Sequence, residues 1–247
     1  MKSYPEMAYD DSFYRTHEPN DPFWSVAESP LLPATSLKGK RILFLGSSVT
    51  LGLRSHNEAV GDYLAKQDGI LLVKEAISGT TLRQEKPDDL SYLSRLLRSD
   101  AYQKRLPLDA IIIQLSTNDA WDPKKLGTPL KNENPETTFG AIEALIRAVK
   151  SHWDCPLFFY TSAYYDLLNG PAYAVMVKGL KEIAEKRGTG IIDLFSDASF
   201  NELGQARHAY WMSDAIHPFR AGYRAWWTPF IRQYLLQYLC KSDVFSL

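Results

Sequence analysis

Two rhythms of apolar and polar residues alternate along the chain from Gly39 onward. Short apolar runs, typical of buried strands, are separated by longer stretches in which apolar residues recur every three or four positions, as in amphipathic helices. In the clearest of these stretches, Thr138–Val149, the apolar side chains share one face and the charged side chains the other. We predict strands at Arg41–Leu45, Ile70–Ala76, Ala110–Leu115, Leu157–Thr161 and Gly190–Leu194, and helices at about Asn57–Lys66, Leu90–Leu97, Pro135–Ser151, Pro171–Lys186 and Ala221–Leu239.

Strands that alternate with helices in this way are typical of βαβ units around a parallel sheet. Five such strands with helices on both faces predict an α/β fold, a flavodoxin-like three-layer α/β/α sandwich with a five-stranded parallel sheet. We assign this domain to residues 39–247.

Residues 1–38 differ from this domain by weak periodicity, several prolines and many aromatic residues. So many aromatic residues argue against a disordered tail. We expect an arm that packs on the domain or on a second subunit, so that a homo-oligomer formed through the arm is one of the options. The aromatic residues of the arm are Tyr4, Tyr9, Phe13, Tyr14, Phe23 and Trp24.

Composition narrows the range of partners. Of the 247 residues 45% are hydrophobic and 23% charged, which suits a globular domain with a core of useful size. A formal net charge of −1 gives no electrostatic reason to expect nucleic acid or an anionic membrane as the main partner. The chain has no run of about 18 apolar residues, and Met1–Asp11 lacks the apolar region of a signal peptide. We therefore expect a cytoplasmic protein without a membrane partner.

The two cysteines, Cys155 and Cys240, are too few for a disulfide framework, and we expect buried or free thiols. No group of Cys and His residues has zinc spacing, so no metal site is expected.

Residues with catalytic chemistry follow the first three predicted strands. The first strand is followed by Gly46, Ser47 and Ser48, the second by Gly79, and the third by Asn118. Open α/β sheets build their sites outside the carboxyl ends of the strands, so these residues are expected at one edge. A serine there is a candidate nucleophile, and a glycine N–H or an asparagine amide can stabilise an oxyanion.

A candidate base lies just before the last predicted helix. Asp214 precedes His217 by three residues, close enough for the carboxylate to reach the near nitrogen of the imidazole. It would fix the tautomer and leave the far nitrogen free to accept a proton from a serine.

Each of these signals has a plainer interpretation when it is taken alone. Serine is a common helix cap, and glycine and asparagine are common in turns. An Asp-x-x-His pair usually lies on the surface without a function. Together, however, the sequence order Ser, Gly, Asn, Asp/His supplies a nucleophile, oxyanion donors, a base and its orienting group, which meets the requirements for acyl transfer.

These residues resemble the sequence blocks of the SGNH (GDSL-type) hydrolases, over roughly residues 40 to 240. The family's Gly-Asp-Ser-x-Thr-x-Gly, second-block Gly, Gly-x-Asn-Asp and Asp-x-x-His-Pro patterns are matched in order. Two positions depart from the family pattern: Ser47 replaces an aspartate and Ser116 replaces a glycine. The matching segments are Gly46–Gly52, Gly79 within Ser78–Thr81, Ser116–Asp119 and Asp214–Pro218.

The resemblance implies a role for each matching residue. Ser48 would be the nucleophile, His217 the base and Asp214 its orienting group. The oxyanion hole would consist of the N–H groups of Ser48 and Gly79 and the side-chain amide of Asn118. No metal or organic cofactor is implied. Neither departure removes a catalytic atom, but Ser47 must change the local hydrogen bonds and Ser116 can tilt the Asn118 loop or narrow the pocket.

The substrate is less defined by the sequence. Trp121, Tyr164 and Trp211 lie near the predicted site and are candidate substrate contacts, although Trp121 could equally cap the core. A small soluble ester or acylated sugar, with acetyl as the acyl group, is the first choice because no long apolar lid is evident. A short-chain esterase or lysophospholipase-like activity, an acyltransferase, and a catalytically silent binding domain remain as alternatives.

Overall fold

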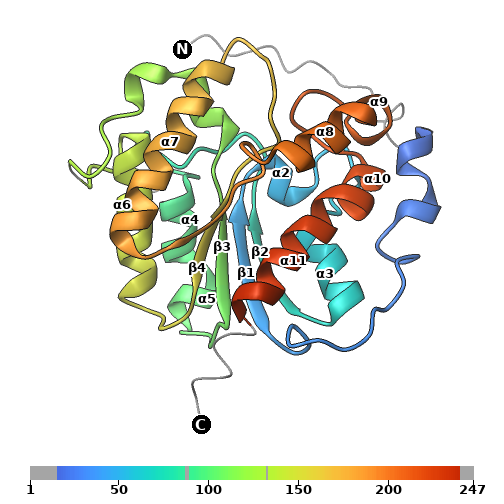
Figure 1. Cartoon of the computed structure of the whole chain (residues 1–247). Coiled ribbons are helices and arrows are strands. Elements are labelled where there is room, and N and C mark those ends of the chain that lie inside the picture. The colour runs from blue at the N-terminus through green and yellow to red at the C-terminus, as the bar shows by residue number, and fades with distance from the viewer. Residues whose placement is uncertain (1–15, 87–88, 132, 240–247) are drawn as a thin grey trace.

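The strands of the protein form one parallel sheet, seen edge-on in the computed structural model of Figure 1. The structure describes residues 16–86, 89–131 and 133–239. Within them the sheet has five strands in the order β2-β1-β3-β4-β5, and all neighbouring strands pair in parallel. The strands are β1 Arg41–Gly46, β2 Leu71–Ala76, β3 Ala110–Gln114, β4 Leu157–Tyr160 and β5 Gly190–Ile192.

Burial follows the position of each strand in the sheet. The central strand β3 is buried along its whole length, because helices cover both faces of the sheet there. The edge strand β2 is only partly buried and carries Lys74 and Glu75. The continuous apolar run of Ile111–Ile113 therefore marks the middle of the sheet.

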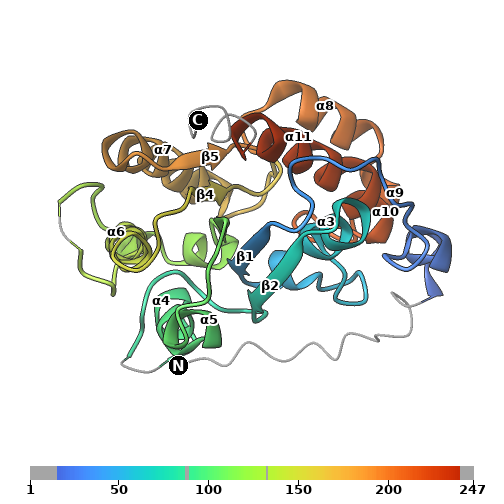
Figure 2. The same ribbon diagram turned by 90° about the horizontal axis from the view of Figure 1, so that it is seen from below.

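Helices cover both faces of the sheet, as the end view in Figure 2 shows. α3 (Val60–Asp68) and α11 (Thr228–Leu239) pack together on one face, and α4 (Tyr92–Arg98), α6 (Thr138–Lys150) and α7 (Gly170–Arg187) lie on the other. The predicted α/β/α sandwich is confirmed. The other described helices are α2 Ser48–Leu51, α5 Asp100–Gln103, α8 Ala198–Ala206, α9 His208–Trp211 and α10 Arg220–Gly222, with 3₁₀ turns at Glu18–Asn20, Pro22–Trp24, Thr117–Trp121 and Pro123–Lys125.

The last predicted helix, Ala221–Leu239, is not one regular α-helix. Between α10 and α11 the backbone takes π-helical form at Tyr223–Trp227. Tyr223, Trp226 and Trp227 lie in this segment at i, i+3 and i+4, and all three are buried. A second difference concerns Asn57, where a helix was predicted to begin. Its φ of 61° is left-handed, so α3 begins only at Val60.

The described part of the N-terminal arm lies against the domain. The indole Nε1 of Trp24 donates to the hydroxyl of Tyr210 (3.1 Å), and the hydroxyl of Tyr63 donates to the Trp24 carbonyl (2.9 Å). The arm aromatics Tyr4, Tyr9, Phe13 and Tyr14 lie outside the described residues, as does Cys240.

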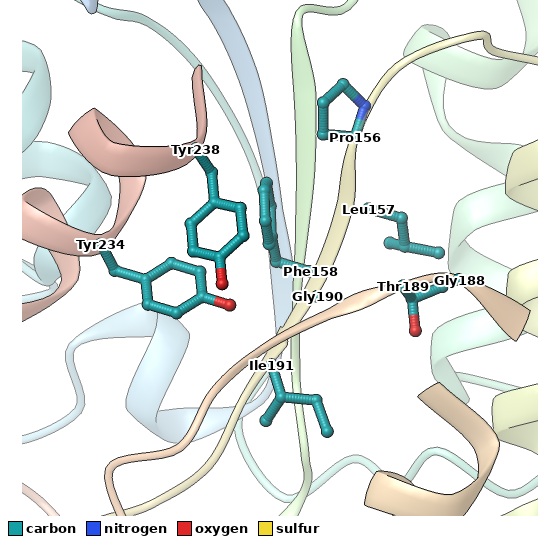
Figure 3. Close-up of a pocket in the computed structure, with 9 residues that line it drawn as sticks. All are labelled: Pro156, Leu157, Phe158, Gly188, Thr189, Gly190, Ile191, Tyr234 and Tyr238. Carbon is teal, nitrogen blue, oxygen red and sulfur yellow. The ribbon is translucent and has the colours of Figure 1, made fainter. Parts of the chain in front are cut away.

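A groove of about 410 Å³ opens at the amino ends of β4 and β5, where Tyr234 and Tyr238 stack beside Phe158 (Figure 3). None of the candidate site residues lines it, because they follow the carboxyl ends of the strands. Among the described helices, none combines the length and the apolar character needed to cross a bilayer.

Candidate active site

The turn after β1 places Ser48 at the carboxyl edge of the sheet, as the first residue of α2. This turn requires glycine at position 46. A Cβ on Gly46 would lie 1.7 Å from Thr50 Oγ1 and 2.7 Å from Gln114 Oε1, well inside contact distance. The chain can therefore fold tightly from the strand into α2 only because no side chain occupies that space.

Ser48 and His217 meet as the sequence predicted. His217 Nε2 lies 2.8 Å from Ser48 Oγ, although 169 positions separate the two residues in the chain. The hydroxyl of the neighbouring Ser47 contacts Gln114 Oε1 instead, at 3.4 Å. The structure thus brings the imidazole to the second serine of the pair, within hydrogen-bonding distance.

Asp214 holds the other side of the imidazole. Its Oδ2 lies 2.8 Å from His217 Nδ1, and its Oδ1 accepts the backbone N–H groups of Ile216 and His217, both at 2.8 Å. Burial raises the pKa of the Asp214 carboxyl, but these hydrogen bonds and the charge of His217 outweigh burial and hold that pKa below its ordinary value. An ionised carboxylate at Nδ1 favours the tautomer in which Nε2 faces Ser48 as an acceptor.

A buried glutamine organises the nucleophile turn, and the sequence analysis missed it. Gln114 ends β3 and is 1% exposed. Its Oε1 accepts the N–H of Ser47 (2.9 Å) and the hydroxyl of Thr50 (2.8 Å), while Thr50 Oγ1 also lies 2.6 Å from the hydroxyl of Tyr160. The sequence does carry a signal for this role, because Gln114 is a polar residue directly after the apolar run Ile111–Ile113.

Arg95 of α4, also missed, ties the ends of two strands together. It donates to the carbonyl of Gly46 at the end of β1 (2.7 Å) and to the carbonyl of Glu75 in β2 (2.9 Å). Burial lowers the pKa of this guanidinium. An arginine in a helix with ordinary spacing gave no sequence signal for this role.

Gly79 and Asn118 lie in two loops that are bonded to each other. Gly79 has a φ of +77°, a left-handed backbone that glycine adopts without strain. The Asn118 amide donates to the carbonyl of Thr80 (2.8 Å), next to Gly79. Ser116 donates to the same carbonyl (3.2 Å) and accepts the Asn118 N–H (3.1 Å). The serine at a family glycine position therefore joins the two loops.

Asp119 binds the loop that carries Gly79 through a second set of hydrogen bonds. Its carboxylate is fully buried and accepts the N–H groups of Leu82 (2.8 Å) and Arg83 (3.2 Å) and the hydroxyl of Thr138 (3.0 Å). Burial raises the pKa of Asp119, while these bonds and the Arg83 charge oppose that rise. The loop carrying Gly79 is thus held to the loop carrying Asn118.

The three predicted aromatic contacts differ in their exposure. Trp121 and Tyr164 are 52% and 53% exposed and follow the carboxyl ends of β3 and β4. Trp211 is only 5% exposed and stacks on Trp226, with ring centroids 5.5 Å apart. Little of the Trp211 ring is therefore open to a substrate, and its role as a substrate contact stays a prediction.

Among the described residues, no three His, Cys, Asp or Glu side chains gather closely enough to hold a metal ion. The arrangement at the sheet edge can instead support acyl transfer without such a centre: a serine hydroxyl facing an imidazole, a carboxylate behind it, and amide donors in the neighbouring loops.

Comparison with known proteins agrees with this geometry. The family described as GDSL-like lipase/acylhydrolase matches residues 44–225. Comparison with curated protein sequences gives no match.

Solved structures of similar fold include a protein from Lactobacillus plantarum, 19% identical, which covers 81% of this chain and 98% of its own with a TM-score of 0.65. The inhibitor-bound aryl esterase of M. smegmatis is 18% identical, with coverages of 79% and 98% and a TM-score of 0.56. A variant of Axe2, an acetyl-xylooligosaccharide esterase from Geobacillus stearothermophilus, is 19% identical, with coverages of 82% and 94% and a TM-score of 0.55. At these identities the likeness establishes the fold.

Proposed function

Because the chain belongs to the GDSL-like lipase/acylhydrolase family and is an ester-bond hydrolase, we propose that Ser48, His217 and Asp214 form its catalytic triad. We propose further that it removes a short acyl group, acetyl first, from a small soluble ester or carbohydrate. The observation that carries the proposal is the 2.8 Å distance between Ser48 Oγ and His217 Nε2, with Asp214 on the opposite ring nitrogen.

In the first step Ser48 Oγ attacks the ester carbonyl while His217 Nε2 accepts its proton. Asp214 remains ionised and stabilises the imidazolium that forms. Its pKa, held below the ordinary value, suits this role, since the carboxylate must not take the proton itself. His217 then protonates the departing alcohol, and the acyl group stays on Ser48.

The negative charge that develops on the carbonyl oxygen needs donors that are already in place. The N–H of Ser48 in the first turn of α2, the N–H of Gly79 and the second amide hydrogen of Asn118 are the proposed donors. The bond from Asn118 to the Thr80 carbonyl uses one amide hydrogen and orients the other. In the second step water attacks the acyl-enzyme with His217 as base, and Ser48 is released.

A carbohydrate ester is supported by one feature of the rim. The exposed indole of Trp121 lies in the loop that follows Asn118, where its face can stack on a sugar ring. The acetyl-xylooligosaccharide esterase among the structural neighbours is compatible with this choice, although its fold alone does not fix the substrate.

A second candidate is an ester with a larger apolar group, as in a short-chain esterase or lysophospholipase-like enzyme. It is favoured by exposed apolar side chains that follow the ends of three strands: Ile77, Trp121 and Leu168, which is 91% exposed. Transfer of the acyl group to an alcohol would use the same groups with a different acceptor. Membership of a hydrolase family argues against the binding-only alternative.

The triad is tested by Ser48→Ala, which is expected to abolish hydrolysis of 4-nitrophenyl acetate and labelling by a fluorophosphonate probe. Ser47→Ala is the matched control and is expected to retain both, because the Ser47 hydroxyl contacts Gln114 and not His217. Full activity of a pure Ser48→Ala protein would overturn the assignment. Asn118→Ala is expected to lower kcat by about 10²–10³.

The substrate class is tested by a panel of 4-nitrophenyl esters of rising chain length, followed by acetylated xylo-oligosaccharides. The carbohydrate proposal predicts the highest kcat/KM for acetyl and a further gain on the sugar esters. A preference for octanoyl over acetyl would favour the second candidate. Product analysis with added sugar or alcohol acceptors separates hydrolysis from acyl transfer.

A further inference from the structure

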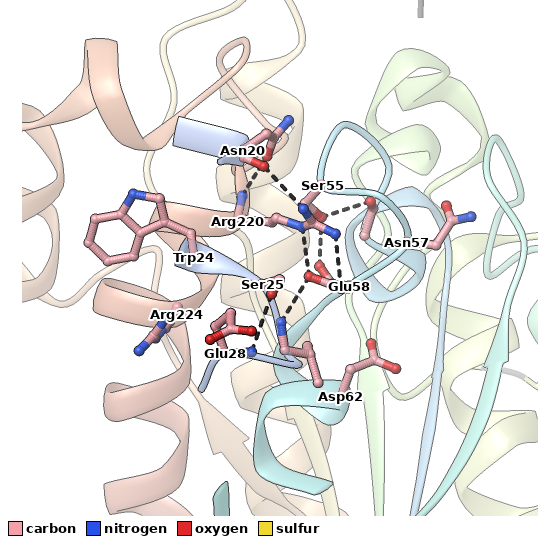
Figure 4. A network of polar contacts seen from close by, with 12 residues as sticks. Asn20, Trp24, Ser25, Glu28, Ser55, Asn57, Glu58, Asp62, Arg220 and Arg224 are labelled. Carbon is pink, nitrogen blue, oxygen red and sulfur yellow. Dashed lines mark hydrogen bonds and ion pairs between the residues drawn. The ribbon is translucent and has the colours of Figure 1, made fainter. Parts of the chain in front are cut away.

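One side chain from the N-terminal arm joins the loop that follows α2 to the start of α10. Figure 4 shows this side chain, Asn20, close to Arg220. Asn20 is 1% exposed. Its Oδ1 accepts the backbone N–H of Arg220 (2.9 Å), and its Nδ2 donates to the carbonyl of Arg54 (2.6 Å). A single amide therefore fixes the distance between these two backbone segments.

An ion pair joins the same two segments beside Asn20. The guanidinium of Arg220 contacts both carboxylate oxygens of Glu58, with Nη2–Oε1 at 3.0 Å and Nε–Oε2 at 2.7 Å. The Nη2 contact is a hydrogen bond, and both side chains are largely shielded from solvent, so this ion pair is screened less than one on the surface. Arg220 Nη1 also donates to the Asn20 carbonyl (3.1 Å), and the backbone N–H of Val26 in the arm donates to Glu58 Oε2 (3.1 Å). We call Asn20, Glu58 and Arg220 the Asn20 clamp.

The clamp acts on segments that lead directly from the reacting groups. Arg54 and Glu58 belong to the loop that follows α2, whose first residue is Ser48. Arg220 begins α10, three residues after His217. Asn20 itself lies outside residues 44–225, the part of the chain that the family match covers. The arm thus contributes Asn20 to the clamp, while Glu58 and Arg220 belong to the matched region.

We propose that Asn20 and the Glu58–Arg220 ion pair are positioning residues that hold Ser48 and His217 at reacting distance, and that the arm is part of the active-site scaffold. This inference rests on the proposed function, since it takes Ser48 and His217 as the reacting pair. The hydrogen bonds that define the clamp end on Arg54, Glu58 and Arg220, not on Ser48 or His217. It limits how far the nucleophile loop and the base loop can move apart.

A hydrogen bond in the core also connects the nucleophile segment to the segment that follows His217, independently of the clamp. The Tyr223 hydroxyl donates to the Val49 carbonyl (2.7 Å), so the two segments are also joined inside the core. Loss of the clamp should therefore let the loops separate without unfolding the sheet. A displacement of about 1 Å between reacting groups can cost on the order of 10²-fold in rate. With the Tyr223 bond intact, we expect a fall in kcat of about 10-fold or more for Asn20→Ala.

The chain offers a matched control far from the site. Asp68 and Arg232 form a partly buried ion pair, in which Arg232 Nε lies 2.9 Å from each carboxylate oxygen and Nη2 lies 2.8 Å from Oδ1. This pair joins the end of α3 to α11, and Asp68 precedes the start of β2 at the amino edge of the sheet. Breaking it removes a comparable contact between elements without touching the loops of Ser48 and His217.

The experiment compares Asn20→Ala, Asn20→Asp and Arg232→Met in the full chain, each checked by circular dichroism and assayed below its melting temperature. For Asn20→Ala we expect kcat on 4-nitrophenyl acetate to fall while KM stays within about twofold, because the clamp does not contact substrate. Fluorophosphonate labelling should slow by a similar factor and still reach completion. Arg232→Met should lower the melting temperature and leave kcat unchanged. Asn20→Asp keeps the acceptor for Arg220 and should fall between wild type and Asn20→Ala.

The proposal is overturned if folded Asn20→Ala keeps kcat within twofold of wild type, or if Arg232→Met loses as much kcat as Asn20→Ala. If Asn20→Ala does not fold, Asn20→Asp decides by the same criteria. Failure of the proposed function looks different, because Ser48→Ala would then keep its activity and the wild type would not be labelled at Ser48.

Discussion

Replacing Gln114 by methionine would remove the oxygen on which the nucleophile turn depends while keeping a side chain of similar length. Gln114 Oε1 accepts from the N–H of Ser47, the hydroxyl of Thr50 and, at 3.3 Å, the N–H of Thr50. The residue is buried between β1 and β4, so water cannot readily replace the lost acceptor. Three donors in the turn before and after Ser48 would then need other partners.

The magnitude depends on which of these donors can find a new partner. The Thr50 hydroxyl already lies 2.6 Å from the Tyr160 hydroxyl and can turn its hydrogen there. The N–H groups of Ser47 and Thr50 have no such alternative among the hydrogen bonds described. A buried donor left unsatisfied costs about 1–3 kcal/mol, so two of them predict a loss of about 2–4 kcal/mol after partial compensation by the apolar side chain.

Urea unfolding at neutral pH, followed by fluorescence, measures this loss directly, and kcat measured on the folded variant reports the displacement of Ser48. Ser47→Ala is the matched control. It removes only the 3.4 Å hydroxyl contact to Gln114 and is expected to cost less than about 1 kcal/mol. The reasoning is refuted if Gln114→Met loses no more stability than Ser47→Ala.

Three further predictions follow from the structure. Gly46→Ala is expected to yield little folded protein, seen as loss of the unfolding transition, because its Cβ would lie 1.7 Å from Thr50 Oγ1. Since the pKa of Asp214 is below its ordinary value in the fold, its carboxylate stabilises the protein above the ordinary pKa, and this stability is lost as pH falls through the lowered pKa. The free energy of unfolding, measured with urea, should fall between about pH 7 and about pH 3 in the wild type. It should fall by less in Asp214→Asn, which lacks the titrating carboxylate. Burial raises the pKa of the Cys155 thiol to about 11, so iodoacetamide at neutral pH should alkylate it far more slowly in the folded than in the unfolded protein, as peptide mass spectrometry can follow.

The sequence was sufficient to predict that candidate residues follow strand ends at one edge of the sheet, because parallel strands bring their carboxyl ends to one side. Ser48, Gly79 and Asn118 each follow a strand, so their approach could be inferred from strand order alone. Asp214 and His217 needed only local spacing. The distance of 2.8 Å between Ser48 Oγ and His217 Nε2 agrees with that inference.

Other features depend on contacts that no local pattern encodes. Trp211 lies near His217 in the sequence, but packing against Trp226 turns its ring into the core. The partners of Asn20 lie 34 and 200 positions away in the chain, so its spacing carried no signal. The π-helical form of Tyr223–Trp227 likewise had no local signal, because its buried residues Tyr223, Trp226 and Trp227 have the i, i+3, i+4 spacing of an ordinary α-helix.

The separation in sequence between the partners of the site has a consequence for biosynthesis. The contact of Ser48 with His217 spans 169 positions, and the contact of Asn20 with Arg220 spans 200. During translation the strands β1 to β5 leave the ribosome before His217 does, so a sheet can assemble while the reacting pair is still incomplete. Such distant pairings form late because chain closure must precede them. Esterase activity in a translation reaction should therefore appear only with the full-length chain. The time at which activity appears would then report when folding is complete, and not when the sheet forms.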